Sequence, residues 1–192
     1  MRITKSDVIQ TAADMADKNG LSNVSLKAVA ESLNIRTPSL YNHIDSLEAM
    51  LREIAHNGMK TMNERMMQAA IGKIGDDAIK SAGITYLNYM IEHPGIYETI
   101  QWVTWHGTEE TEKIFDNYLS LLKTLALSCN FNPVNIDEIL NLLTGVLHGY
   151  TTLQLRYAFT KPDEVRTSLS TALDTVLAGL HQKYDQHEKE HL

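Results

Sequence analysis

The stretch SLKAVAESLNIRTPSLYNH, residues 25–43, decides the fold of this chain. Ser25 is a good N-cap residue, and the apolar residues after it are spaced i, i+3, i+4 and i+7, which is one face of an α-helix. Asn34 interrupts that spacing, and Pro38 stands in the first turn of a second helix, where its missing N–H costs nothing. The stretch therefore predicts two short helices joined by a tight turn. The apolar positions of the first helix are Leu26, Val29, Ala30 and Leu33.

The second of these helices is expected to direct Leu40, Tyr41 and Ile44 to the core. Its outer face then shows small hydroxyls, an amide and an imidazole, a set that suits insertion into the major groove of DNA. A surface helix pair with solvated polar groups is the alternative, and the spacing alone supports the two about equally. The outer residues are Thr37, Ser39, Asn42 and His43.

The composition is that of a helical globular protein: 43% of the 192 residues are hydrophobic and four are proline. No apolar signal-peptide core fits the charged first twenty residues, and no segment approaches the length of a membrane span. Cys129 is the single cysteine and cannot form an internal disulfide. We therefore expect a cytoplasmic protein that is not bound to a membrane.

The net charge of −7 is unevenly distributed along the chain. Residues 1–60 contain seven Lys or Arg and seven Asp or Glu, so the segment with the helix pair is neutral and the remainder carries the whole excess. A basic N-terminal segment would have supported DNA binding more strongly. The acidic remainder is expected to keep DNA away from the rest of the molecule.

Helical periodicity continues through the rest of the chain, and nothing reads as strand alternation. Capping patterns begin the first helix at Thr4 with Asp7, and the long helix at Asp45 with Glu48. The breaks fall at glycine, proline and asparagine. Besides the helix pair, helices are expected over residues 5–18, 46–71, 76–92, 100–105, 109–127, 136–157 and 165–184.

The last two of these helices are apolar around most of their girth, which predicts partners on more than one side. The inner stripes run from Ile136 to Tyr157 and from Val165 to Tyr184, while Leu142, Val146, Leu153 and Leu177 widen them. A second copy of the chain would cover the outer side in a four-helix seam. The residues expected in or next to that interface are Leu143, Leu147, Tyr150, Leu173, Val176 and Leu180.

The sequence resembles the tetracycline-repressor (TetR) family of transcriptional regulators. The resemblance rests on Gly20, the run SLKAVAESLNIRTPSLYNHI and the helix start SLEAML, and it is specific over residues 4–55. YLNYMIEHPGIY and LLTGVLHGYTTLQL are weaker local echoes. Two positions depart from the family: Asn34 stands where most members have glycine, and Leu47 stands where many have a phosphate-binding lysine.

The resemblance implies an all-α homodimer. Residues 1–45 would form an N-terminal three-helix helix-turn-helix head, and residues 46–192 a C-terminal helical domain for ligand binding and dimerisation. The implied function is a ligand-responsive regulator, a repressor that a small apolar or aromatic effector of unknown identity releases from a palindromic operator in double-stranded DNA. Phosphate contacts or head positioning would fall to Ser25, Lys27, Thr37, Ser39, Tyr41 and His43, and base edges to Arg36, Pro38 and Asn42.

Aromatic residues, methionines and histidines mark a candidate effector pocket. Trp102, Trp105 and His106 are spaced i, i+3 and i+4, and a lining of aromatics and Met with a few polar tips suits an apolar or aromatic ligand. Packing of the core is the commoner role for any one of them. The candidates are Met62, Met66, Tyr86, Tyr89, Trp102, Trp105, His106, Phe115, Tyr118 and His148.

A helical small-molecule carrier or enzyme with a vestigial DNA-binding head is the competing hypothesis. Against an enzyme, we find no Gly-rich phosphate loop, no nucleophile elbow and no catalytic carboxylate pair beside a histidine. The string His187-Glu188-Lys189-Glu190-His191 has the H-E-x-x-H form of zinc hydrolases, but it ends one residue from the C-terminus in polar surroundings. We expect no metal site, no cofactor and no catalytic residue.

Overall fold

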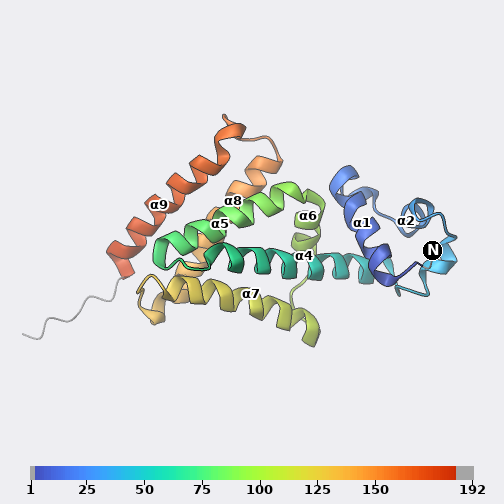
Figure 1. Ribbon diagram of the computed structural model, residues 1–192, viewed down its shortest axis with the longest axis horizontal. Helices are drawn as coiled ribbons and strands as arrows, with labels where there is room; N and C mark the ends of the chain where they lie inside the picture. The colour runs from blue at the N-terminus through green and yellow to red at the C-terminus, as the bar shows by residue number, and fades with distance from the viewer. Residues whose placement is uncertain (1–2, 185–192) are drawn as a thin grey trace, which may run out of the picture. The chain divides into compact units, whose positions relative to one another are not determined.

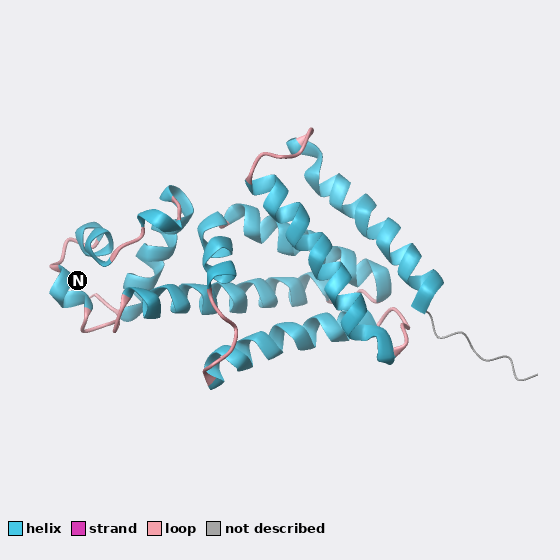
Figure 2. Ribbon diagram, turned by 180° about the vertical axis from the view of Figure 1, so that it is seen from behind, coloured by secondary structure: helices cyan, strands magenta, loops and turns pink. Residues whose placement is uncertain are grey.

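The structure is a computed structural model that describes residues 3–184. Within this range it consists of helices joined by loops, with no β-strand, which confirms the predicted all-α class (Figures 1 and 2). No helix in the described range is long and apolar enough to cross a membrane. The α-helices are α1 (Lys5–Asn19), α2 (Leu26–Ser32), α3 (Thr37–Leu40), α4 (Leu47–Ala70), α5 (Gly75–Glu92), α6 (Pro94–Trp102), α7 (Glu109–Leu127), α8 (Ile136–Leu155) and α9 (Val165–Tyr184).

The helices pack into two compact units. Unit 1 comprises Met1–Thr61 and Glu92–Phe115, so it contains α1–α3, α6 and the first parts of α4 and α7. Unit 2 comprises Met62–Ile91 and Asp116–Leu192, so it contains α5, α8, α9 and the remaining parts of α4 and α7. Each unit has its own apolar interior.

The first helix of unit 1 is closed at both ends as its sequence predicts. The Thr4 hydroxyl accepts the backbone N–H of Asp7, the Asp7 carboxylate accepts the N–H of Thr4, and this reciprocal capping box fixes the first turn. Gly20 follows the last turn with φ 83°, a conformation that glycine adopts without strain. The inner face of α1 comprises Val8, Ile9, Ala12, Ala13 and Ala16.

The turn between α2 and α3 is a Schellman motif. The N–H of Ile35 donates to the carbonyl of Ala30 at 2.9 Å, and the N–H of Asn34 donates to the carbonyl of Glu31 at 3.0 Å. Asn34 has φ 54°, so it supplies the left-handed residue that this motif requires, at a position where most family members have glycine. Ser25 caps α2 through the N–H of Ala28 at 3.1 Å.

Two details of this segment differ from the sequence-based expectation. Tyr41 was expected in the core, but it is 57% exposed because α3 ends at Leu40 and the chain turns away. Leu40 and Ile44 are buried as expected. The cap of α4 is Ser46, whose hydroxyl accepts the N–H of Ala49 at 3.0 Å, and not Asp45.

The short helix α6 also differs from its prediction. It begins at Pro94 and ends at Trp102, whereas residues 100–105 were expected. Pro94 was taken only as the end of the preceding helix, but proline also favours the first turn of a new one. Trp105 and His106 therefore lie in the loop after α6 and do not share a helical face with Trp102.

In unit 2, α8 and α9 pack together and α5 lies against both. A Cβ on Gly83 would stand 3.1 Å from side-chain atoms of Leu147 and of Leu173, so glycine allows the close approach. Polar contacts tie α5 to α9 at the edges: Lys80 to Asp174 at 2.7 Å and His181 to Asp76 at 2.9 Å. The three helices therefore form one packed layer with a shared apolar interior.

The predicted inner stripe of α8 is wrong at its C-terminal end, whereas that of α9 is buried at both ends, at Val165 and Tyr184. Tyr157 lies beyond the end of α8, has φ 54° and is 86% exposed, so it is not part of the stripe. On α9, Leu177 is fully buried and belongs to the inner face instead of widening the outer one. The inner face of α9 comprises Val165, Leu169, Leu173, Leu177, Leu180 and Tyr184.

Candidate functional site

The α2–turn–α3 segment presents every sequence-predicted DNA contact at the surface. The inner side chains of α2 and α3 anchor the segment: Val29, Ala30 and Leu40 are buried in the core of unit 1. Exposed positions are Ser25, Lys27, Arg36, Pro38, Tyr41 and Asn42, and half-buried positions are Thr37, Ser39 and His43. The segment thus has a rigid apolar base and a polar outer face, as a groove-inserting helix pair requires.

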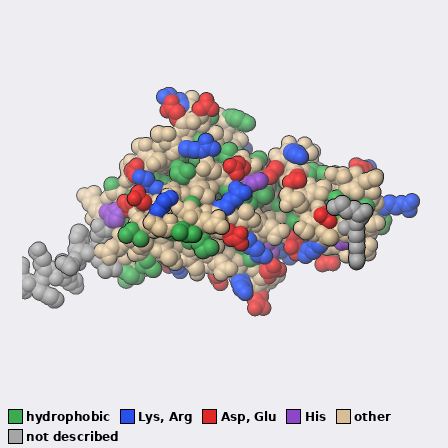
Figure 3. All heavy atoms as spheres, in the orientation of Figure 1, with side chains coloured by type: hydrophobic (Ala, Val, Ile, Leu, Met, Phe, Trp, Pro, Cys, Tyr) green, Lys and Arg blue, Asp and Glu red, His purple; other side chains and the backbone are tan. Residues whose placement is uncertain are grey.

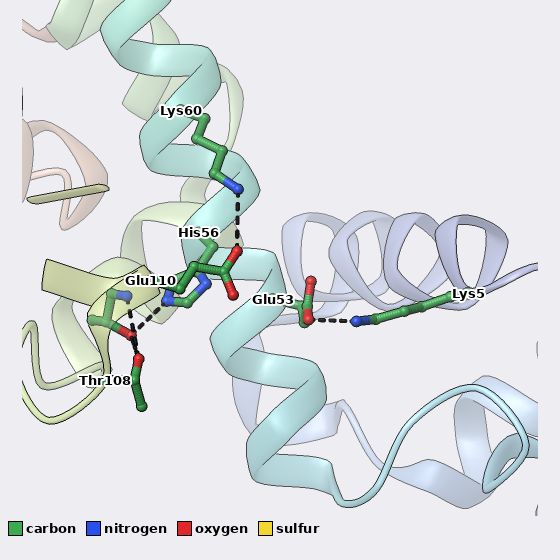
Figure 4. Close-up of polar contacts among 7 residues, drawn as sticks. Lys5, Glu53, His56, Lys60, Thr108 and Glu110 are labelled. Atoms are coloured by element: carbon green, nitrogen blue, oxygen red, sulfur yellow. Dashed lines mark hydrogen bonds and ion pairs between the residues drawn. The ribbon is translucent and has the colours of Figure 1, made fainter. Parts of the chain in front are cut away.

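Carboxylates accompany the cations of unit 1. Lys5 contacts Glu53 at 2.5 Å and Arg52 contacts Glu48 at 2.9 Å, while Lys27 lies 3.9 Å from Glu31 (Figure 4 shows the first pair). On the face drawn in Figure 3, Lys and Arg side chains lie among Asp and Glu and form no continuous basic patch. This arrangement agrees with the zero net charge of residues 1–60.

Asp17 joins α1 to α6 and was not singled out in the sequence. Its Oδ1 accepts the N–H groups of Gly95 at 2.8 Å and Ile96 at 3.2 Å, and its Oδ2 lies 2.8 Å from Nδ1 of His93. A carboxylate on the first N–H groups of a helix acts as its cap and favours the helix dipole. The sequence signal that could have revealed this contact is the His-Pro-Gly run. It starts a helix, and the free N–H groups at the N-terminus of that helix need a hydrogen-bond acceptor.

A buried polar cluster lies between α4 and the start of α7 in unit 1 (Figure 4). Nε2 of His56 lies 3.0 Å from Oγ1 of Thr111, which lies 2.7 Å from Oγ1 of Thr108. Burial lowers the pKa of His56 below its usual value of 6.5, so the ring is neutral near pH 7. Its Nδ1 is buried with no hydrogen-bond partner in the described chain.

Four of the candidate ligand residues fall in unit 1, and His106 connects the two places they occupy because its ring lies edge-on to Phe115, with centroids 6.4 Å apart. Trp105 stacks on Phe115, with ring centroids 6.0 Å apart, and these two fill space beside His56. Trp102 and His106 instead line an open surface depression of about 490 Å³ together with Arg52 and several threonines. Trp102 is 50% exposed there. These residues therefore do not form one enclosed apolar pocket.

Unit 2 contains an apolar cavity of about 30 Å³. Side chains from α4, α5, α7 and α8 line it, among them Met66, Ile79, Leu122 and Leu140, and Thr144 is the polar member of the lining. The volume holds one or two water molecules, so a larger ligand enters only when side chains rotate. Of the candidates in the sequence, Met66 lines this cavity. Met62, Tyr86, Tyr89 and Tyr118 are buried elsewhere in unit 2, and His148 is half-buried.

Two polar pairs lie at or beside the cavity lining. The Tyr118 hydroxyl hydrogen-bonds the side chain of Thr144, which is in the lining, and burial raises the pKa of Tyr118 to about 12. The Tyr86 hydroxyl lies 3.2 Å from Nδ1 of His148, which follows Thr144 by one turn of α8. The polar groups next to this apolar cavity are therefore hydroxyls and an imidazole.

The lowered pKa of His148 is expected to make the stability of the folded state depend on pH. Burial lowers this pKa below 6.5, so the folded state favours the neutral ring, and the unfolded chain binds the proton more readily. The contribution of His148 to stability is therefore present above about pH 6.5 and is lost as pH falls through the folded-state pKa. We expect the fall in Tm from about pH 7.5 to 5.5 to be smaller for His148→Gln than for the wild type. An equal fall in both would contradict this role of His148.

The residues expected at a dimer interface lie mostly inside unit 2. Leu143, Leu147, Leu173 and Leu180 are at most 7% exposed, and the first two line the cavity. Tyr150 and Val176 are half-buried. A different stripe of α8 is open to the outside: Leu142 and Leu153 are 47% and 44% exposed, and a Cβ on Gly145 or Gly149 would meet no atom within 4 Å.

No group of three or more His, Cys, Asp or Glu side chains in residues 3–184 could hold a metal ion. The H-E-x-x-H string at residues 187–191 lies outside the described residues. Cys129 is buried.

Comparison with known proteins identifies the chain. The model of the tetracyclin repressor-like C-terminal domain matches residues 79–176. An uncharacterised HTH-type transcriptional regulator of Bacillus subtilis, YobS, is 32% identical over 179 residues, covering 93% of either chain.

Solved structures share the fold at low identity. A protein of unknown function from Rhodococcus has a TM-score of 0.80 at 15% identity, with 94% of this chain and 96% of that chain covered. A TetR variant of Acinetobacter baumannii in complex with minocycline has a TM-score of 0.69 at 17% identity, covering 94% and 98%. With the family model matching half of the sequence and a full-length relative above 30% identity, the chain belongs to the TetR family of transcriptional regulators.

Proposed function

We propose that this TetR-family regulator is a homodimeric, cytoplasmic repressor that a small apolar effector releases from a palindromic operator. The observation that carries the proposal is the segment of α2, its Schellman turn, α3 and the residues just after it. It lies on an apolar base, and of its nine candidate DNA contacts six are exposed and three are half-buried. Family membership supplies the class of target, which is double-stranded DNA. The protein acts by binding alone, without catalysis.

Residues of the helix-turn-helix head are assigned to base or phosphate contacts by their exposure and their chemistry. Asn42 is exposed directly after α3, and an Asn side chain can bond an adenine edge with both its amide groups. Arg36 and Pro38 flank it as further base-edge candidates. Ser25, Lys27, Thr37, Ser39, Tyr41 and His43 are assigned to phosphates or to positioning of the head.

Asn42→Ala is expected to relax base preference, because it removes the side chain assigned to a base edge. The cost is about 1–3 kcal/mol against the preferred base, while affinity for unrelated DNA stays within about threefold of the wild type. Tyr41→Ala is the matched control: it is equally exposed, so the fold survives, and it should weaken all sequences alike. Selection from random-sequence DNA followed by fluorescence anisotropy measures both. Intact selectivity in Asn42→Ala would remove this residue from the base contacts.

The neutral charge of residues 1–60 predicts a shallow salt dependence of operator binding. With Lys5, Lys27 and Arg52 beside carboxylates, few phosphates are neutralised per head. We expect the slope of log affinity against log salt concentration to be nearer about −4 than the value of about −9 that ten phosphate contacts give. Titration between about 50 and 300 mM KCl measures it, and a slope of about −9 would refute the charge argument.

The effector site is proposed in the apolar cavity of unit 2, which Met66 lines, and not in the more polar depression of unit 1. Apolar burial provides most of the binding free energy of a small ligand, and the unit 2 cavity is the apolar one. The remaining candidates from the sequence, Met62, Tyr86, Tyr89 and His148, would be reached as the cavity widens. The Acinetobacter relative binds minocycline, which supports a ligand-responsive role for this chain.

A further inference from the structure

The lining of the unit 2 cavity specifies the chemistry of its ligand further than family membership does. We infer that the effector is a neutral, mainly aliphatic molecule with one hydroxyl or carbonyl group, held with that group against Thr144 and Tyr118. The inference rests on the proposed effector site and narrows its ligand class. It is argued from three observations on the described residues.

The first observation is the aliphatic character of the walls. Leu122 and Leu125 from α7, Leu140 and Leu143 from α8, and Met66 from α4 surround the space. Leucine and methionine side chains rotate without leaving a polar group unsatisfied, so the cavity can widen around a flexible chain. Aliphatic side chains cannot hydrogen-bond to a ligand. Hydrocarbon therefore binds favourably in this cavity, and each additional polar group on the ligand lowers the affinity because it is buried without a hydrogen bond.

The second observation is the position of the polar groups. Thr144 is in the lining, and its side chain hydrogen-bonds the Tyr118 hydroxyl. Tyr118 precedes Leu122 by one turn of α7, and His148 follows Thr144 by one turn of α8, so both lie next to lining residues. One polar group on the ligand can join the Thr144–Tyr118 pair, and a second would find only apolar side chains among the other lining residues.

The third observation concerns charge. No Lys, Arg, Asp or Glu is among the residues that line the cavity. Burial raises the pKa of Tyr118 and lowers that of His148, so both neighbours are neutral near pH 7 and neither pairs with an ion. A charged ligand would therefore be buried without a counterion, which is costly.

Three eight-carbon probes of matched length test the inference: 1-octanol, octanoate and octylammonium. Their binding to the full chain at about pH 7.5 is followed by displacement of the neutral dye N-phenyl-1-naphthylamine and by calorimetry. We expect 1-octanol to bind at least about tenfold more tightly than either ion. Octanoate should gain affinity at about pH 5.5, where more of it is protonated. Binding of octanoate or octylammonium as tight as that of 1-octanol would overturn the inference, and so would no binding of 1-octanol.

Thr144→Val tests the hydrogen bond between the ligand and the Thr144 hydroxyl, because valine lacks the hydroxyl and keeps the shape of the side chain. We expect it to weaken 1-octanol about 3–10-fold, the effect of one hydrogen bond. Thr151→Val is the matched control: its buried hydroxyl donates to the carbonyl of Leu147 in the same helix, and it is not among the residues that line the cavity. Equal affinities of 1-octanol for Thr144→Val and wild type would show that the polar group of the ligand does not bind at Thr144.

Operator binding is measured separately, with DNA selected from a random library. If the protein binds this DNA but none of the three probes, the ligand class is refuted and the proposed DNA-binding function is not. A protein that binds 1-octanol with unchanged DNA affinity keeps the ligand class and refutes the effector role, since linkage requires each ligand to change the affinity of the other by the same factor.

Discussion

The variant Leu142→Glu/Val146→Glu is expected to be monomeric and to bind operator at least about a hundredfold more weakly than the wild type. Leu142, Gly145, Val146, Gly149 and Leu153 form one outer stripe of α8, and this stripe faces away from the buried residues of unit 2. Exposed apolar side chains and two glycines without a neighbour suit close packing against a second copy of the chain. Two carboxylates in that seam would be buried without partners.

The loss of operator affinity follows from the loss of the second head. Two heads joined in a dimer bind the second half-site at a high effective concentration, which is worth about 10²–10⁴ in affinity. Sedimentation velocity and anisotropy with a palindromic site measure the two effects. Asn117→Glu places the same charge on an exposed position of α7, away from the α8 stripe, and it should remain dimeric. A dimeric double variant would place the interface elsewhere.

This stripe differs from the leucines that sequence spacing assigned to the interface. Leu143 and Leu147 are in the cavity lining, so a charge there would damage unit 2 whether or not the protein dimerises. Leu142 and Val146, each one position before those residues, separate the two effects. The assignment of Tyr150 and Val176 to the interface stays a prediction that the same sedimentation experiment tests in Tyr150→Ala and Val176→Ala.

Gly95→Ala is expected to lower the Tm by about 6–12 °C. A Cβ at Gly95 would stand 2.2 Å from the backbone carbonyl carbon of Ala16 and 2.5 Å from its oxygen. Backbone atoms cannot rotate aside, so α6 would move off α1 and lose the hydrogen bonds to Asp17. We take the cost as roughly 3 kcal/mol, at the upper end for overpacking, and each kcal/mol lowers Tm by about 2–4 °C in a chain of this size.

Gly179→Ala is the matched control, because its Cβ would meet no atom within 4 Å and it lies inside α9. The same substitution there adds no clash and gains helix propensity. We expect a Tm within about 3 °C of the wild type. Differential scanning calorimetry measures both variants. Equal losses would show that the α1–α6 approach is not the rigid contact that the distances describe.

The sequence by itself determined the features that depend on neighbouring residues. The capping box at Thr4, the cap at Ser25, the left-handed Asn34 and the run of helices all follow from spacing and local hydrogen bonding, which act within one or two helical turns. The outward position of Asn42 and the burial of Leu40 follow in the same way. These features suffice for the all-α class and for the head that family membership assigns to DNA.

Only the tertiary structure decided which side of an apolar helix is covered. Along α8, spacing separates the stripe of Leu143 from Leu142, but it cannot show that Leu143 and Leu147 line a cavity inside unit 2 instead of a dimer interface, because burial depends on segments far apart in the chain. The same is true of Asp17, whose role appears only when α6 lies on α1, and of the candidate ligand residues, which share a composition but fall into two units. Hydrophobic contact is non-directional, so the identity of the neighbour is a property of the whole fold.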